Sequence, residues 1–124
     1  MAASFDDLLA ANASFAEDFR LAGFDGVAHA GIAVVTCMDS RIDPLAMLGL
    51  RPGDAKMLRN PGGRVTDDAL AALVLSVNLL GVERVLIVPH TRCAMTGTSE
   101  TELRARVSRA SGRDASLETF GAIE

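Results

Sequence analysis

Residues 32–41 read IAVVTCMDSR and residues 84–93 read RVLIVPHTRC, and these two stretches decide the fold of the 124-residue chain. Each contains a run of aliphatic and β-branched residues, which is typical of a β-strand. Neither run alternates apolar with polar residues, so the pattern predicts strands that are covered on both faces, as in parallel sheets. Polar, chemically active side chains follow both runs.

The segments around these strands predict the helices that connect them. A weaker strand is expected over residues 56–59, and helices are expected over residues 5–21, 44–49, 66–80 and 99–109. The helix over 66–80 has the clearest signals, because Thr66 is a good N-cap residue and Gly81 is a common stop after a C-terminus. Alternating strands and helices favour right-handed crossovers and a three-layer α/β fold, in which helices flank a mostly parallel sheet.

Length and composition bound the class of protein. The length fits a single domain, with residues 1–24 as an N-terminal helical arm and residues 30–124 as the α/β core. Hydrophobic residues make up 49% of the chain, which excludes intrinsic disorder, and the net charge of −4 argues against nucleic-acid binding. The longest apolar run, residues 69–80, is shorter than the roughly 20 residues of a membrane span. No export signal precedes Arg20, the first basic residue, so we expect a cytoplasmic protein without membrane contact.

Both cysteines of the chain, and one of its two histidines, follow predicted strands. Cys37, Asp39 and Arg41 come after the first strand, and His90 and Cys93 come after the third. The carboxyl ends of parallel strands share one edge of the sheet, where ligands bind. Two thiolates and an imidazole suit zinc and leave a fourth position open, unless Asp39 fills it as in a structural site. Alternatively, each cysteine is a small buried hydrophobe, or the two thiols form a redox pair.

These residues resemble the motifs of the β-class carbonic anhydrases. The family pattern Cys-x-Asp-x-Arg matches residues 37–41, Arg-Asn-x-Gly matches residues 59–62, and His-x-x-Cys matches residues 90–93. The resemblance covers nearly the whole chain. Two departures are that Ala94 replaces the usual glycine and that family members usually continue some tens of residues beyond position 124, with a helix and an edge strand. We therefore expect the sheet to be short at its C-terminal side.

The resemblance implies a zinc ion held by Cys37, His90 and Cys93, and reversible hydration of carbon dioxide to bicarbonate through zinc-bound hydroxide. It also implies that Asp39 accepts a hydrogen bond from that hydroxide, while Arg41 holds Asp39 in a charge-assisted pair. When the pair breaks, Asp39 becomes a conditional fourth zinc ligand in a closed state. Because two thiolates neutralise the charge of the ion, its water should be a weak acid, and we expect activity to rise toward alkaline pH.

A glycine-containing turn after the second strand is expected to shape the wall of the substrate pocket. The candidates are Asn60, Gly62 and Gly63, together with Arg59, because glycine lets backbone approach closely. A plain strand-to-helix turn is the alternative. Carbon dioxide is small and apolar, so its pocket should be a short apolar crevice.

The resemblance also implies assembly and leaves the substrate open. In the family the crevice lies at a dimer interface, which implies a homodimer or a larger assembly. Phe5, Leu8, Phe15 and Phe19 would then pack on the partner; the alternative is that they pack on their own sheet. Relatives that hydrolyse carbonyl sulfide or carbon disulfide share the same zinc ligands, so such a zinc hydrolase is the alternative enzyme. A non-catalytic zinc-binding remnant is the alternative to an enzyme.

Overall fold

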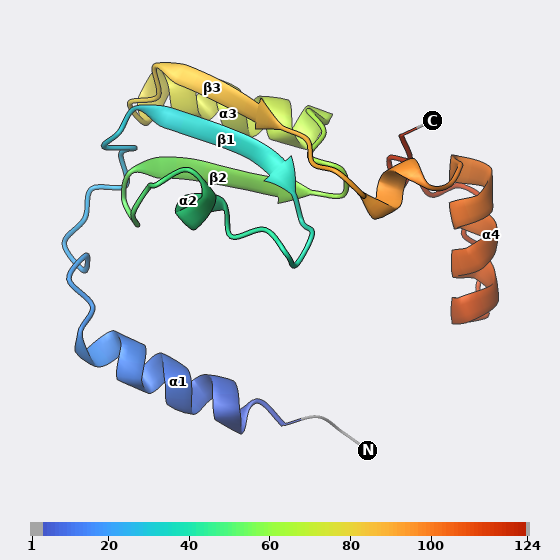
Figure 1. Ribbon diagram of the computed structural model, residues 1–124, viewed down its shortest axis with the longest axis horizontal. Helices are drawn as coiled ribbons and strands as arrows, with labels where there is room; N and C mark the ends of the chain where they lie inside the picture. Colours follow the sequence, from blue (N-terminus) through green and yellow to red (C-terminus); the bar gives the residue numbers. More distant parts are fainter. Residues whose placement is uncertain (1–3, 124) are drawn as a thin grey trace.

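The computed structural model describes residues 4–123, which contain one parallel β-sheet of three strands. Strand β1 (Ile32–Cys37) lies in the middle, and β2 (Ala55–Asn60) and β3 (Arg84–Val88) flank it in the order β2-β1-β3 (Figure 1). The predicted strands are confirmed, each to within a residue at either end. Because the pairing is parallel, all three strands end at the same edge of the sheet.

Strand β1 forms the centre of the core because it is covered on both faces. Residues 33–36 have no exposed surface. Ala33 and Val35 join a hydrophobic cluster with Leu73 of helix α3 (Asp67–Leu79), which packs on the sheet. The uninterrupted apolar run in the sequence therefore predicted the burial of this strand correctly.

Strand β3 differs from its prediction. Its apolar run predicts cover on both faces, yet Val85, Leu86 and Ile87 are 41%, 39% and 43% exposed. The reason is its place in the sheet: β3 pairs with β1 on one side, and among residues 4–123 no further strand pairs with its other side. An apolar run indicates that a strand favours burial, but the tertiary structure decides which element buries it.

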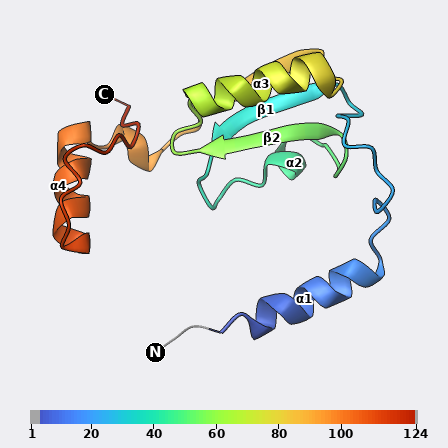
Figure 2. The same cartoon turned by 180° about the vertical axis from the view of Figure 1, so that it is seen from behind.

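The four described α-helices begin close to where the sequence predicts them, and side-chain caps set the starts of three of them. Apart from α3, the described helical elements are α1 (Asp6–Glu17), α2 (Pro44–Met47), the 3₁₀ turn η1 (Ala94–Thr96) and α4 (Glu100–Ser111). The side chains of Asp43, Thr66 and Ser99 each accept a backbone N–H from the first turn of α2, α3 and α4. Figures 1 and 2 place α3 on one face of the sheet and α2 on the other, which confirms the three-layer α/β arrangement.

Helix α1 lies away from the sheet (Figures 1 and 2) and is shorter than the predicted range of 5–21. Phe5, Leu8, Phe15 and Phe19 are all exposed, so in this chain they do not pack on their own sheet. The described helices include none that is both long and apolar enough to cross a membrane.

Candidate metal centre

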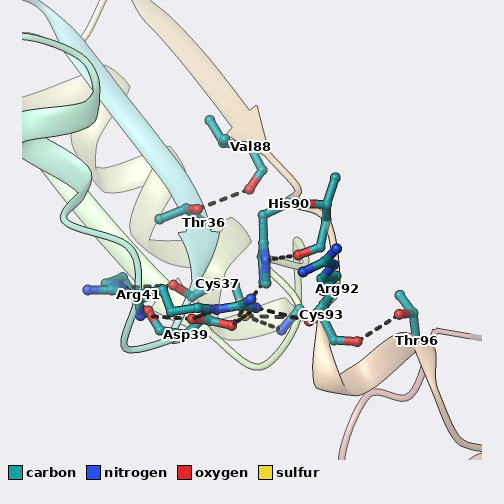
Figure 3. A network of polar contacts seen from close by, with 12 residues as sticks. Thr36, Cys37, Asp39, Arg41, Val88, His90, Arg92, Cys93 and Thr96 are labelled. Carbon is teal, nitrogen blue, oxygen red and sulfur yellow. Dashed lines mark hydrogen bonds and ion pairs between the residues drawn. The ribbon is translucent and has the colours of Figure 1, made fainter.

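The strand order places the candidate site where the connections from β1 and β2 run to opposite sides of the sheet. The chain leaves β1 for β2 on one side, and then passes through α3 to β3 on the other side of β1. Loops that diverge in this way leave a crevice beyond the carboxyl ends of the strands, where α/β proteins bind ligands. Thr36 Oγ1 donates a hydrogen bond of 3.0 Å to the Val88 carbonyl oxygen, which ties the ends of β1 and β3 together beside the crevice (Figure 3).

Three potential metal ligands meet in this crevice. One ligand atom each from Cys37, His90 and Cys93 lies within 4.8 Å of the other two, and the two Sγ atoms are 3.9 Å apart. Both cysteines are buried, with 4% and 6% of their surface exposed. The prediction that residues from distant stretches of the chain meet at this sheet edge is therefore confirmed.

The histidine of this group is oriented for metal binding. His90 Nδ1 lies 2.8 Å from the Thr91 carbonyl oxygen, which can only accept a hydrogen bond, so Nδ1 carries the proton. The lone pair of Nε2 is then free. Nε2 is buried and has no hydrogen-bond partner among the described residues. A buried imidazole nitrogen without a partner is costly unless a ligand uses its lone pair, so this atom fits a metal ion facing the two cysteines.

The thiol of Cys37 ionises easily in this environment. Burial would raise its pKa, but the hydrogen bond from the Gly62 N–H, 3.3 Å from Sγ, together with the neighbouring His90 imidazole, outweighs burial and lowers the pKa of Cys37 to about 7. The contact with Cys37 also raises the pKa of His90. A thiolate that is accessible near neutral pH is the form that binds metal ions.

Asp39 and Arg41 form a tight pair beside the three ligands (Figure 3). Arg41 donates through Nε to Asp39 Oδ1 at 2.9 Å and through its terminal nitrogen to Oδ2 at 2.7 Å, and its backbone N–H also reaches Oδ1 at 2.8 Å. These contacts hold the pKa of Asp39 far below its usual range. Oδ2 lies 3.9 Å from His90 Nε2, so the carboxylate borders the ligand group while remaining paired with the guanidinium.

Arg41 also connects the two loops of the site. Its guanidinium donates to the Arg92 carbonyl oxygen at 3.0 Å, in the loop that carries His90 and Cys93. Arg92 has a φ of 56°, a left-handed conformation that is rare outside glycine. This conformation turns the loop between the two ligands so that its carbonyl faces Arg41. The sequence did not reveal this contact, because it joins residues 51 positions apart.

Arg59 has a more specific role than the pocket wall that the sequence suggested. From β2, its Nε donates to the Cys37 carbonyl oxygen at 2.9 Å and its terminal nitrogen donates to the Asp39 carbonyl oxygen at 2.8 Å. The guanidinium therefore fixes the backbone of the loop that carries both the first ligand and the carboxylate. Arg59 reaches these oxygens because the pairing register of β1 and β2 places it opposite Thr36, near the end of β1.

The remaining wall candidates support the loop that follows β2. The Asn60 side chain bonds the backbone of Arg64 in both directions, at 2.6 and 2.8 Å, which closes the turn. Gly62 supplies the N–H that reaches Cys37. Gly63 lies so close to β1 that a Cβ atom built on it would be 3.0 Å from the Cys37 backbone nitrogen.

A cavity of about 530 Å³ opens beside the ligand group. Its lining includes Cys37, Asp39 and Cys93 on one side. Its apolar lining residues are Met38, Pro61, Ala94 and Met95. Of the residues in this turn, Pro61 lines the cavity, whereas Asn60, Gly62 and Gly63 are not among its lining residues. The arrangement offers a small apolar space next to three metal ligands and an ionised carboxylate.

The fold and this site together define an α/β protein whose sheet edge carries a Cys–His–Cys group able to bind a metal ion with one position left open. The family model for carbonic anhydrase matches residues 32–115, and the chain belongs to the β-carbonic anhydrase family. The resemblance seen in the sequence motifs is thereby confirmed.

The chain is similar both to carbonic anhydrases and to carbon disulfide hydrolases. Beta-carbonic anhydrase 1 of Mycobacterium tuberculosis is 35% identical over 107 residues, covering 86% of this chain and 65% of that protein. A carbonic anhydrase structure from Streptococcus mutans superposes with a TM-score of 0.88 at 35% identity, covering 99% of this chain and 75% of that one. A carbon disulfide hydrolase of Saccharolobus solfataricus is 39% identical over 80 residues, covering 64% of this chain and 39% of that protein. The chain thus spans at most 65% of the length of these two curated relatives.

Proposed function

We propose that the protein is a zinc-dependent carbonic anhydrase, which catalyses the reversible hydration of carbon dioxide to bicarbonate and a proton. The observation that carries this proposal is the convergence of Cys37, His90 and Cys93, whose ligand atoms lie within 4.8 Å of one another beside an ionised Asp39. Membership of the carbonic anhydrase family supports the reaction, and the donor set supports zinc, which favours sulfur and imidazole ligands in tetrahedral sites.

Cys37, His90 and Cys93 would hold the zinc ion and leave one position free. Zinc bound there would lower the pKa of a water molecule in the free position and so supply a nucleophile, although less strongly than with neutral ligands, because two thiolates offset the charge of the ion. The protein contributes the orientation of the ligands. The Thr91 carbonyl oxygen fixes the tautomer of His90, and the Gly62 N–H stabilises the Cys37 thiolate.

Asp39 and Arg41 would orient the reacting water. The Asp39 carboxylate would accept a hydrogen bond from that water and so hold it in one orientation. Arg41 keeps the carboxylate ionised and holds it by two side-chain hydrogen bonds, so that Asp39 does not take the free position as a fourth ligand. If this pair broke, Asp39 would be free to become a fourth ligand of the metal ion, which is the closed state that we propose.

The cavity supports a small apolar substrate. Met38, Pro61, Ala94 and Met95 line it with apolar surface, and such a surface does not hold water strongly. Carbon dioxide fits this chemistry. A carbon disulfide or carbonyl sulfide hydrolase is the second candidate, because the same apolar lining suits those molecules and a carbon disulfide hydrolase is among the relatives. Turnover of the candidate substrates, compared on one preparation, separates the two.

We also propose that the chain acts as one domain, with residues 30–124 as the core and residues 1–24 as an arm, and that it assembles as a homodimer or a larger oligomer. The apolar side chains of α1 support assembly, since Phe5, Leu8 and Phe15 are each more than 60% exposed. Cys37 and Cys93 are both unpaired thiols, which supports a reducing, cytoplasmic location.

The proposal is tested by zinc analysis and stopped-flow carbon dioxide hydration on the same preparations of wild type and the Cys37→Ser variant. We expect stoichiometric zinc and turnover in the wild type, and loss of both in the variant. Ser14→Ala, on helix α1 and away from the sheet, is the control and should keep both. Full zinc without turnover in the wild type would identify a non-catalytic zinc-binding module, and turnover without zinc would refute the proposed site.

A further inference from the structure

The C-terminal segment of the described chain folds back over the metal site. Its residues 118–123 follow α4 and return toward η1 (Figure 1). The Ile123 N–H donates to the Met95 carbonyl oxygen at 2.8 Å. The Ile123 side chain lies over Gly62, because a Cβ atom built on that glycine would be 3.1 Å from Ile123 Cδ1. The segment therefore contacts the turn after β2 and the η1 turn, which are two of the three segments that border the cavity.

A single carboxylate holds this segment in place. Glu100, at the first turn of α4, accepts the Phe120 N–H at 3.0 Å through Oε2 and the Ala122 N–H at 2.6 Å through Oε1. Its side chain is 22% exposed. The two N–H bonds, with a further contribution from the Gly121 N–H and the charge of Arg104, lower the pKa of Glu100. Charge-assisted bonds of this kind are stronger than those between neutral groups.

Arg104 reinforces the attachment from the next turn of the same helix. Its Nε donates to the Glu118 carbonyl oxygen at 2.7 Å, and its terminal nitrogen lies 3.8 Å from Glu100 Oε2. Helix α4 thus holds the segment at both of its ends. Ile123 itself is held by its bond to Met95 and packs on Gly62.

From this geometry we infer that Glu100 is a positioning residue for the metal site, acting through the segment 120–123 on Gly62. Ile123 limits where the Gly62 backbone can lie, and the Gly62 N–H is the donor to Cys37 Sγ at 3.3 Å. Glu100 acts through the backbone N–H groups of Phe120 and Ala122. Glu100 holds the segment 120–123, and this segment positions the Gly62 N–H. The position of that N–H in turn sets the hydrogen bond that the Cys37 thiolate receives.

The inference rests on the proposed metal site and is tested with Co²⁺, whose thiolate charge-transfer absorption reports on Cys37 and Cys93 directly. Metal-free wild type, Glu100→Gln and Glu102→Gln are titrated with Co²⁺ against a competing chelator. Glu102 is the matched control, because it lies on the same helix and pairs with Arg109 at 3.5 Å, away from the segment. Groups that orient metal ligands typically contribute 10–100-fold to affinity, so we expect Glu100→Gln to bind Co²⁺ about tenfold more weakly.

The spectrum separates positioning from general destabilisation. A thiolate that loses a hydrogen bond holds its lone pair at higher energy, so the charge-transfer band of Glu100→Gln should move to longer wavelength. Glu102→Gln should keep the wild-type affinity and band. Ile123→Ala keeps the carboxylate and removes the packing on Gly62, and it should reproduce the effect of Glu100→Gln. Wild-type affinity and band in Glu100→Gln would overturn the inference, whereas absence of Co²⁺ binding in the wild type would overturn the proposed metal site itself.

Discussion

Replacing Gly63 with alanine should destabilise the protein and disturb the metal site together. Gly63 has a φ of +64°, in the left-handed region that disfavours residues with a Cβ atom. A Cβ atom there would be 3.0 Å from the backbone nitrogen of Cys37 and 3.0 Å from the carbonyl carbon of Thr36. Both belong to β1, the fully buried central strand, so the neighbouring backbone has no space into which it can move.

The magnitude follows from two separate costs. A left-handed conformation costs an L-residue roughly 1–2 kcal/mol. Overpacking against a rigid neighbour adds roughly 1–3 kcal/mol. The free energy of unfolding should therefore fall by about 2–5 kcal/mol in Gly63→Ala. Gly112→Ala isolates the first cost, because Gly112 has a φ of +71° but no neighbouring atom within 4 Å of the added Cβ.

The assay is urea unfolding of the metal-free proteins under reducing conditions, followed by zinc titration. Gly63→Ala should be less stable than Gly112→Ala by the overpacking cost alone, about 1–3 kcal/mol. It should also bind zinc more weakly, because the clash displaces the backbone of Cys37. Equal losses of stability in the two variants would refute the argument that close approach to β1, rather than backbone conformation, requires glycine at this position.

Three further predictions concern the site. In Arg41→Met the pKa of Asp39 should rise toward its usual value, because Arg41 holds it low. The wild type should therefore have a higher free energy of unfolding than the variant above pH about 4, and this difference should disappear as the pH falls through the depressed pKa of Asp39. Carboxyl NMR titration and acid unfolding measure both effects, and an unchanged Asp39 titration would contradict them. The kcat for carbon dioxide hydration should rise toward alkaline pH, since two thiolates weaken the acidity that zinc confers; a flat profile across neutral pH would argue against this. Removal of zinc should lower Tm, since zinc binds the native state. It should also let mild peroxide oxidise Cys37 and Cys93 to a disulfide, because their Sγ atoms are 3.9 Å apart. If thiol counting shows equal oxidation with zinc bound, the proposed site is wrong.

The convergence of Cys37, His90 and Cys93 could be predicted from the sequence because it depends on few physical rules. The apolar runs before Cys37 and His90 predict strands, and parallel strands end at one edge of the sheet, so the polar residues after them meet. The pairing of Asp39 with Arg41 was implied by the family resemblance, and the structure contains this pair.

The contacts that orient these residues could not be read from the chain. Arg59 reaches the carbonyl oxygens of Cys37 and Asp39 only because β2 pairs with β1 in a particular register. Glu100 reaches the segment 120–123 only because the chain reverses after α4.

The sequence by itself determined which segments become strands and helices, and which side chains supply sulfur, imidazole and carboxylate at the end of the sheet. Those properties follow from local propensity and from the shared direction of parallel strands. Only the tertiary structure decided the order β2-β1-β3, the exposure of β3 and the hydrogen bonds that hold the ligand loops. Each of these depends on which groups, distant along the chain, come within about 3 Å of a hydrogen-bond donor. No periodic pattern in the sequence indicates which groups form such pairs.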